Sequence, residues 1–235
     1  MCGRYRLTAK ERYLRDHFGL DDDPQWEPRW NIAPTQQVAV VCQKPREPRR
    51  AFSQMRWGLI PSWAKDASIA SHTINGMSET VADKPAFKES LRRRRCLIPA
   101  EGFYEWQRLG PGRKRPYHLG LADDSLFAFA GLWDRWRDPA TNTSIETCTI
   151  LTTKPNALVA DVHDRMPVIL RPEDYDLWLD PGATDPAKVA HLLTPLNAQL
   201  MRKYPVSHFV NRAENDGPEC ACEISLTATA QPGLF

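Results

Sequence analysis

The sequence predicts an α+β domain built on a mainly antiparallel, curved, barrel-like sheet with short flanking helices. Short apolar segments rich in β-branched and aromatic residues recur along the chain, and turn residues separate them. These segments do not alternate regularly with helical patterns, which argues against a doubly wound parallel sheet. The twenty prolines favour frequent turns over long helices.

A short helix is expected near the N-terminus. Thr8 and Glu11 have the spacing of a helix capping box, and Leu14 and Phe18 continue as an apolar stripe. The next segment, residues 21–36, is rich in Asp, Pro and Trp and predicts an ordered loop.

Two strands follow this loop, and the first of them is expected to be buried. They cover residues 38–42 and 51–60, and the polar stretch 43–50 is expected to join them as a hairpin loop. Residues 62–80 show no clear period, so we expect a loop of the kind that carries functional residues. A helical pattern then covers residues 84–95.

Strand patterns dominate the second half of the chain. The expected strands cover residues 96–98, 102–109, 116–121, 126–134, 144–153, 167–170 and 205–211. The basic turn LGPGRKRP joins two of them. Short helical segments are expected at residues 156–165, directly after Pro172, and at 186–193.

The length of 235 residues fits one domain, which we expect over residues 1–222, followed by a mobile tail at 223–235. The 31 Lys and Arg against 29 Asp and Glu exclude a histone-like polycation and an acidic disordered chain. No apolar run is long enough for a membrane helix, and the N-terminus has no apolar signal region. We therefore expect a cytoplasmic monomer with no membrane partner.

The six cysteines are scattered, and without a secretory signal they predict no disulfides. Cys42, Cys96 and Cys148 lie in apolar stretches and are expected to be buried. Cys220 and Cys222 form C-x-C, which is not the spacing of a zinc knuckle, and the six His show no metal-binding pair. No phosphate-binding glycine motif occurs either. We expect neither a metal nor a cofactor.

Cys2 differs from the other cysteines because it follows the initiator methionine. Removal of Met1 would leave an α-amine and a thiol on adjacent carbons, with reference pKa values near ~7.7–8.0 and ~8.5. Such a pair converts an aldehyde first to a Schiff base and then to a thiazolidine ring. The alternative is a cysteine in a frayed terminus. Gly3 and Arg4 favour the functional interpretation, since one allows close backbone approach and the other binds phosphate or carboxylate.

Three further polar residues are candidates for catalysis, each with a plainer alternative. Asn75 lies in the unpatterned loop and precedes glycine, which also suits a simple turn. Glu105 lies among aromatic residues that would raise its pKa, but it could also be an exposed strand residue. His163 is flanked by charged residues and is either a surface turn residue or an acid/base group.

Aromatic and basic residues suggest a nucleic-acid surface near these candidates. Three tryptophans and three arginines lie in or beside the same segments: Trp57, Trp63, Trp106, Arg4, Arg56 and Arg165. Such interleaving suits single-stranded nucleic acid, whose bases stack and whose phosphates pair with cations. The near-neutral net charge requires that any such surface be local. The run of arginines at 92–95 is better explained by a helix C-terminus.

Several motifs occur in the order found in one protein family. They are MCGRY at the start, NIAP at 31–34, RWGLIPSW at 56–63, N-x-x-x-E-T at 75–80, CLIPAEGFYEW at 96–106, AGLW at 130–133, LTTKPN at 151–156, HDRMPVIL at 163–170 and PVS..VN at 205–211. In these motifs the chain resembles the SRAP family, the abasic-site processing proteins. The resemblance covers roughly residues 2–211 and implies an SRAP-type fold.

The resemblance implies covalent capture of abasic sites in single-stranded DNA. Cys2, as the new N-terminus, would form a thiazolidine with the ring-opened sugar. Asn75 would position the reacting groups, Glu105 would act as general acid/base, and His163 would assist proton transfer and reversal of the link. The family is also credited with autoproteolytic release of its N-terminal residue and with a lyase-like activity. Its action on damaged DNA implies a nucleoid location at replication forks.

The same resemblance implies a set of DNA contacts. Arg4 would bind a flanking phosphate, and Pro34 with Trp63 would wedge into the DNA beside the lesion. Trp106 and Arg165 are expected as further DNA contacts.

One motif departs from the family pattern. The family usually has N-A-R-x-E-T where this chain has N-G-M-S-E-T, so Met77 replaces an arginine that contacts phosphate. Losing one phosphate contact is expected to weaken binding and reduce its salt dependence, and Lys65 or Lys84 are candidates to compensate.

Two other functions remain open from the sequence. One is an N-terminal-nucleophile amidohydrolase or cysteine peptidase, in which the α-amine of Cys2 serves as base. The other is a non-catalytic module that binds single-stranded DNA, for which Cys2 would be dispensable.

Overall fold

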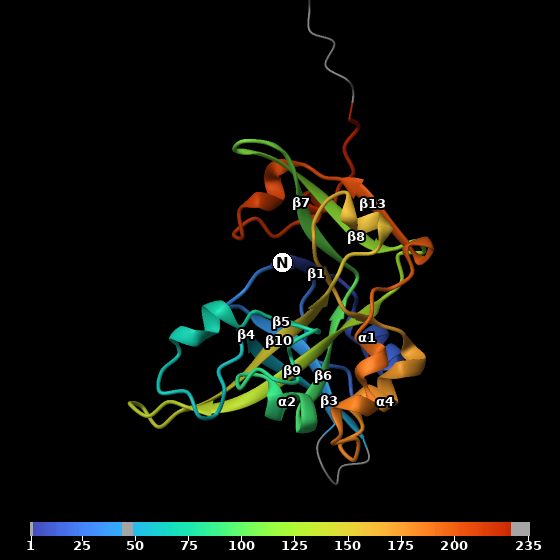
Figure 1. Ribbon diagram of the computed structural model, residues 1–235. Helices are drawn as coiled ribbons and strands as arrows, with labels where there is room; N and C mark the ends of the chain where they lie inside the picture. The colour runs from blue at the N-terminus through green and yellow to red at the C-terminus, as the bar shows by residue number, and fades with distance from the viewer. Residues whose placement is uncertain (1, 44–48, 227–235) are drawn as a thin grey trace, which may run out of the picture.

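The protein has an α+β fold, as the sequence predicts (Figure 1). The computed structural model describes residues 2–43 and 49–226. Two sheets and several short helices make up this part of the chain. No helix within it is long and apolar enough to cross a membrane.

The larger sheet closes on itself into a barrel. Around the ring, each strand is hydrogen-bonded to the next in the order β10 (Ser144–Thr153), β4 (Arg50–Trp57), β3 (Gln37–Gln43), β6 (Arg95–Ala100), β9 (Phe127–Arg137) and back to β10. Short strands extend it: β5 (Asn75–Met77) and β11 (Met166–Pro167) pair with β10, and β12 (Ile169–Leu170) pairs with β9. β10 is parallel to β4 and β5, and the other strand pairings are antiparallel. This confirms a mainly antiparallel, barrel-like core.

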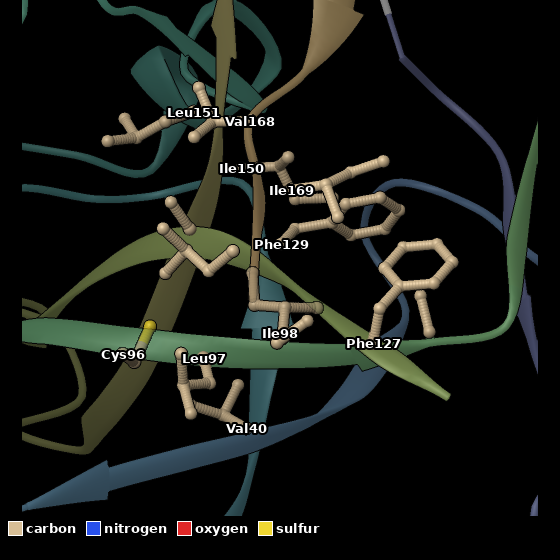
Figure 2. Packing of buried hydrophobic residues seen from close by; sticks show 14 of the residues in the cluster. Val40, Cys96, Leu97, Ile98, Phe127, Phe129, Ile150, Leu151, Val168 and Ile169 are labelled. Atoms are coloured by element: carbon tan, nitrogen blue, oxygen red, sulfur yellow. The ribbon is translucent and has the colours of Figure 1, made fainter. Parts of the chain in front are cut away.

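Apolar side chains from four barrel strands fill the core. Val40, Ile98, Phe129 and Ile150 from β3, β6, β9 and β10 belong to one buried cluster, in which Figure 2 shows Val40 beside Leu97. In β3 the burial is continuous although successive side chains point to opposite faces, so both faces of this strand are covered. Three of the buried side chains are the thiols expected there: Cys42, Cys96 and Cys148.

The smaller sheet carries the N-terminus and lies at one end of the barrel (Figure 1). Its strands follow the spatial order β13 (Met201–Pro205), β8 (Arg113–Leu121), β7 (Gly102–Gly110), β1 (Tyr5–Leu7) and β2 (Arg29–Ile32). All of its pairings are antiparallel. β1 and β7 continue into the residues predicted to carry chemistry.

The helices are short and flank the sheets. The α-helices are α1 (Glu11–Phe18), α2 (Lys88–Arg93), α3 (Ala157–Ala160) and α4 (Tyr175–Leu179). The 3₁₀-helices are η1 (Ser68–His72), η2 (Pro172–Asp174), η3 (Pro186–Lys188), η4 (Ala190–Leu192), η5 (Ala198–Leu200), η6 (His208–Asn211) and η7 (Pro218–Cys220). α1 ends at Gly19, whose left-handed φ of 61° suits glycine.

The capping box predicted for the first helix is wrong. The N-cap of α1 is Lys10, which makes no side-chain cap hydrogen bond. Both the backbone N–H and the hydroxyl of Thr8 donate instead to Glu101 Oε2, and the hydroxyl does so at 2.6 Å. A carboxylate distant in sequence has replaced the local partner that the motif predicts.

Other predicted elements also differ. The strand expected at 205–211 is wrong, because β13 ends at Pro205 and η6 follows. The hydroxyl of Ser207 accepts a hydrogen bond from the N–H of Phe209 and so caps η6. The loop expected at 21–36 contains β2, and two 3₁₀-helices replace the helical stretch at 186–193.

The C-terminal segment, residues 206–224, folds back onto the smaller sheet. Its Val206, Val210 and Cys220 pack in one cluster with Tyr104 and Tyr204. The segment returns to the sheet at its end, where Ile224 N–H donates to the carbonyl of residue 205 at 3.0 Å. Residues 227–235 lie outside the described residues, so the mobile tail stays a prediction.

His118 on β8 is buried between an aromatic ring and the sheet backbone. Its ring stacks on Tyr204 with a centroid separation of 4.8 Å. A Cβ on Gly102 would lie 2.1 Å from His118 Nε2, so glycine is required there. Neither ring nitrogen has a hydrogen-bond partner among the described residues. Burial, and then the charge of Arg6, lower the pKa of His118 to about 3.

Acidification is therefore expected to destabilise the protein through His118. Between about pH 6.5 and 3 the unfolded chain binds a proton here and the folded chain does not, so the free energy of unfolding falls as pH is lowered. From pH 6.5 to pH 5 the loss is about 2 kcal/mol. Urea unfolding should be measured at pH 7.5 and at pH 5.0. The free energy of unfolding lost between these two pH values should be smaller in His118→Phe than in the wild type by this amount. An equal loss in both proteins would contradict the prediction.

Candidate active site

The pairing of β1 with β7 places the N-terminus beside Glu105. Tyr5 pairs with Phe103, and the N–H of Tyr104 donates to the carbonyl of Arg4 at 2.9 Å. Continued toward the N-terminus, this antiparallel register brings residues 2 and 3 alongside Glu105. Cys2 and Glu105 lie in two separate motifs, MCGRY and CLIPAEGFYEW, and the pairing of β1 with β7 brings them together.

The thiol of Cys2 is fully buried. Its nearest hydrogen-bond partner is the carbonyl of Arg4, at 4.0 Å from Sγ. Burial raises the pKa of this thiol well above its ordinary value, and the negative charge of Glu105 raises it further. The thiol is therefore protonated at neutral pH and needs a nearby base to become a nucleophile.

Glu105 and His163 form an acid/base pair beside Cys2. Glu105 is 3% exposed, and burial raises its pKa to about 7, with a further rise from Asp164. His163 Nε2 lies 3.8 Å from Glu105 Oε2. The N–H of Arg165 donates to His163 Nδ1 at 3.0 Å, and Asp164 Oδ1 also lies 3.0 Å from this nitrogen. Burial lowers the pKa of His163, which favours the neutral ring beside Glu105.

Asn75 is buried on β5, not exposed in a turn. It pairs in parallel with Ile150 of β10, and its Nδ2 donates to the carbonyl of Ile150 at 3.4 Å. Its Oδ1 is buried and accepts no hydrogen bond from a described residue. An unsatisfied buried acceptor is costly, so this oxygen suits a donor that arrives with a ligand or forms during a reaction.

Arg165 lies across the end of β10, next to β5. Its two Nη atoms each lie 2.9 Å from a carboxylate oxygen of Glu79, and Nη2 also donates to the carbonyl of Thr152 at 2.8 Å. Thr152 pairs with Met77, whose side chain is 37% exposed. Arg165 therefore holds the motif 75–80 against β10, and its charge is paired with Glu79.

Arg4 and Trp106 hold the C-terminal segment over the N-terminal strand. Arg4 donates to Asn31 Oδ1 at 3.0 Å and to the carbonyls of Val210 and Asn211 at 2.8 and 3.2 Å. Its guanidinium carbon lies 5.9 Å from the ring centroid of Trp106. Trp106 Nε1 in turn donates to Asn211 Oδ1 at 2.8 Å. Both residues act as anchors here, and their contacts with DNA stay predictions.

Trp63 is presented to solvent by a well-anchored loop. Its side chain is 60% exposed. On one side of it, Ser62 N–H donates to Asp134 Oδ2 at 3.0 Å, and on the other Trp136 Nε1 donates to the carbonyl of Ala64 at 2.7 Å. An exposed indole on an anchored loop is suited to stacking against a base.

Pro34, the other predicted wedge residue, lies half-buried in the turn between β2 and β3. The next residue, Thr35, has a positive φ of 75°, and its N–H donates to the carbonyl of Trp57 at 2.9 Å. The turn is thus attached to the end of β4, directly before the loop that carries Trp63.

Two polar residues that hold the site together, Asn31 and Glu79, were not singled out from the sequence alone. Asn31 is fully buried, and its Nδ2 donates to the carbonyls of Val210, Arg212 and Asn215. Glu79 is the partner of Arg165. Asn31 belongs to the motif NIAP and Glu79 to the motif N-x-x-x-E-T. A polar residue at these motif positions is the feature from which the sequence could have predicted a role in the site.

The arrangement provides a buried thiol with a carboxyl group that titrates near neutrality and a histidine next to it. Such a set can protonate a leaving hydroxyl and accept a proton from a thiol, which is general acid/base chemistry. Among residues 2–43 and 49–226, no group of three or more His, Cys, Asp or Glu side chains is placed to hold a metal ion.

The chain is similar to known proteins over most of its length. The family model for SOS response associated peptidase (SRAP) matches residues 1–213. The abasic site processing protein YoqW of Bacillus subtilis is 43% identical over 222 residues, covering 93% of this chain and 98% of that protein. The abasic site processing protein HMCES of Gallus gallus is 32% identical over 267 residues, covering 96% of this chain and 79% of that protein.

A solved structure shares the fold. The crystal structure of a protein from Bacteroides thetaiotaomicron superimposes with a TM-score of 0.86 at 26% identity, covering 95% of this chain and all of that one. The family model spans most of the sequence, and curated relatives align over nearly its whole length. The chain therefore belongs to the SOS response associated peptidase (SRAP) family, whose curated relatives are abasic site processing proteins.

Proposed function

We propose that this protein captures abasic sites in single-stranded DNA as a covalent thiazolidine through Cys2 after removal of Met1. The observation that carries the proposal is the buried thiol of Cys2 beside Glu105, whose pKa of about 7 lets it act as both acid and base. The names of the relatives support an abasic site as the target.

The reaction balances with these groups. The α-amine of Cys2 attacks the aldehyde carbon of the ring-opened sugar and forms a carbinolamine. Protonated Glu105 donates to its hydroxyl, water leaves and an imine forms. Glu105, now a carboxylate, accepts the proton of the Cys2 thiol, and the sulfur adds to the imine carbon. Because dehydration leaves the imine protonated, addition of the sulfur gives a neutral ring nitrogen, and the net change is one water lost.

The other residues would orient these steps. The unsatisfied Oδ1 of Asn75 would accept a hydrogen bond from the amine or the sugar hydroxyl. His163 would return protons to Glu105. Trp63 and Pro34 would separate the bases next to the lesion, and Arg4, Trp106 and Arg165 would contact the flanking strand.

The same centre suits two further activities. Release of Met1 by the chain itself would expose the amine, and a Schiff base at the sugar carbon would permit lyase-type strand cleavage. Action on abasic single strands would place the protein in the cytoplasm, on the nucleoid at damaged forks. The two rival functions differ in outcome, since an amidohydrolase turns over amides without DNA and a binding module forms no covalent bond.

Incubation of purified protein with abasic single-stranded DNA is expected to give a heat-resistant adduct on a denaturing gel. Its intact mass should equal protein without Met1 plus DNA minus one water. An N-terminus that keeps Met1 in protein from cells, or the absence of an adduct, would contradict the proposal. Amide hydrolysis without DNA would favour the peptidase alternative.

A further inference from the structure

The hairpin that joins β7 to β8 is strongly basic, and its basic side chains are not paired with carboxylates. Residues 106–116, here called the basic hairpin, contain Arg108, Arg113, Lys114 and Arg115 and no acidic residue. None of the four forms an ion pair within 4.0 Å with a carboxylate of the described residues. Arg165, by contrast, is paired with Glu79. The basic hairpin therefore has charge available for an anion.

Two of these cations face each other across the hairpin. Arg108 pairs directly with Lys114 in the antiparallel register, and both side chains are exposed. Like charges in directly opposed positions destabilise a sheet. A bound anion between them would remove this repulsion, so the pair is better explained by ligand binding than by folding.

A cavity lies on the same face of the basic hairpin. It has a volume of about 380 Å³ and is lined by Trp106, Gly112, Lys114, His208 and Asn211. One wall is an indole, and another carries a cation and an imidazole. This combination fits a nucleotide, whose base stacks and whose phosphate pairs with the cation.

Two lining residues of the cavity, Trp106 and Asn211, also contact Arg4, one of the residues expected to bind DNA. Trp106 lies next to Glu105 in the chain, and Arg4 contacts both its ring and the carbonyl of Asn211. Figure 1 shows the hairpin of β7 and β8 at the end of the molecule formed by the smaller sheet, and the N-terminus between this sheet and the barrel. The charge of the hairpin also reaches the centre, because Lys114 lowers the pKa of Glu105 and Arg108 lowers that of His163.

We propose that the basic hairpin is a phosphate-binding arm for the single strand on one flank of the lesion. Arg108 and Lys114 would hold a backbone phosphate, and the adjoining base would enter the cavity against Trp106. The inference rests on the proposed function and names the part of the substrate bound here.

The double variant Arg108→Gln/Lys114→Gln tests the arm. Each lost phosphate contact lowers the slope of log K against log salt by about 0.7 for a single strand, so two contacts lower it by about 1.4. At 0.1 M salt this corresponds to a loss of about 10- to 30-fold in affinity for undamaged single-stranded DNA. The control Lys88→Gln/Arg92→Gln removes two charges from α2, and its slope should equal that of the wild type.

Two abasic oligonucleotides locate the arm on the DNA. One has its lesion near the 5′ end and the other near the 3′ end, so each lacks one flank. The double variant should lose affinity for only one of them. An unchanged salt slope, or an equal loss on both oligonucleotides, would overturn the inference. Absence of adduct with the wild type would instead refute the proposed function, while the salt slope still tests the arm.

Discussion

Protein carrying Cys2→Ala is expected to form no heat-resistant adduct with abasic single-stranded DNA. Alanine is also small, so Met1 would still be removed and the α-amine would still form a Schiff base. Without the thiol the five-membered ring cannot close, and the imine hydrolyses back to aldehyde and amine. The measurement is adduct yield on a denaturing gel after heating, with and without borohydride treatment.

Borohydride makes this prediction specific, because it reduces an imine to a stable amine. The Cys2→Ala protein should therefore give adduct only in the borohydride sample, whereas the wild type gives it in both. Cys222→Ala is the matched control, since Cys222 is an exposed thiol of the C-terminal segment and its loss should change nothing. Heat-resistant adduct from Cys2→Ala at the level of the wild type would disprove the thiazolidine mechanism.

Replacement of Glu105 by glutamine is expected to slow adduct formation by about 10²- to 10⁴-fold, the usual contribution of a general acid/base. In the proposed mechanism the dehydration step needs protonated Glu105, so the rate of the wild type should fall as pH rises through about 7. Glutamine cannot titrate, so this descending limb should disappear in Glu105→Gln. Only the rise that accompanies deprotonation of the α-amine near pH ~8 should remain. Single-turnover rates between pH 5.5 and 9 provide the measurement.

The free energy of unfolding of Glu105→Gln shows whether the slower reaction results from misfolding. The folded pKa of Glu105 is about 7, and its unfolded value is near ~4.3, so its contribution to the free energy of unfolding is lost as pH rises between them. Above pH 7 Glu105→Gln should therefore be at least as stable as the wild type. Glu146→Gln, which removes a carboxylate paired with Arg135, is the control for charge. A descending limb that persists in Glu105→Gln would assign it to another group.

Local patterns predicted the strands better than the ends of helices. The apolar run at 38–42 predicts a buried strand wherever it folds, because β-branched side chains suit a sheet covered on both faces. Thr8 and Glu11 satisfied the capping-box spacing, yet the polar groups of Thr8 bind Glu101. In the same way, the apolar pattern at 205–211 could not show that the carbonyls of Val210 and Asn211 would accept from Arg4.

The candidate site shows the same division. Motif order named Cys2, Asn75, Glu105 and His163, and the structure unites three of them through strand pairing and charge. Asn75 joins them indirectly, through β10 and the segment that holds His163 and Arg165. From the sequence, Glu105 could be either an exposed strand residue or a buried acid. Its exposure of 3% in the structure shows that it is buried.

The sequence by itself determined the chemistry that is local to a residue. The adjacent amine and thiol of a terminal cysteine, the β-forming segments, the charge of the basic hairpin and the loss of a cation at Met77 are all readable without a fold. Only the tertiary structure decided the protonation of Glu105, the pairing of Arg165 with Glu79 and the anchoring of the C-terminal segment by Arg4. These properties depend on burial and on contacts between residues far apart in the chain, which local patterns do not encode.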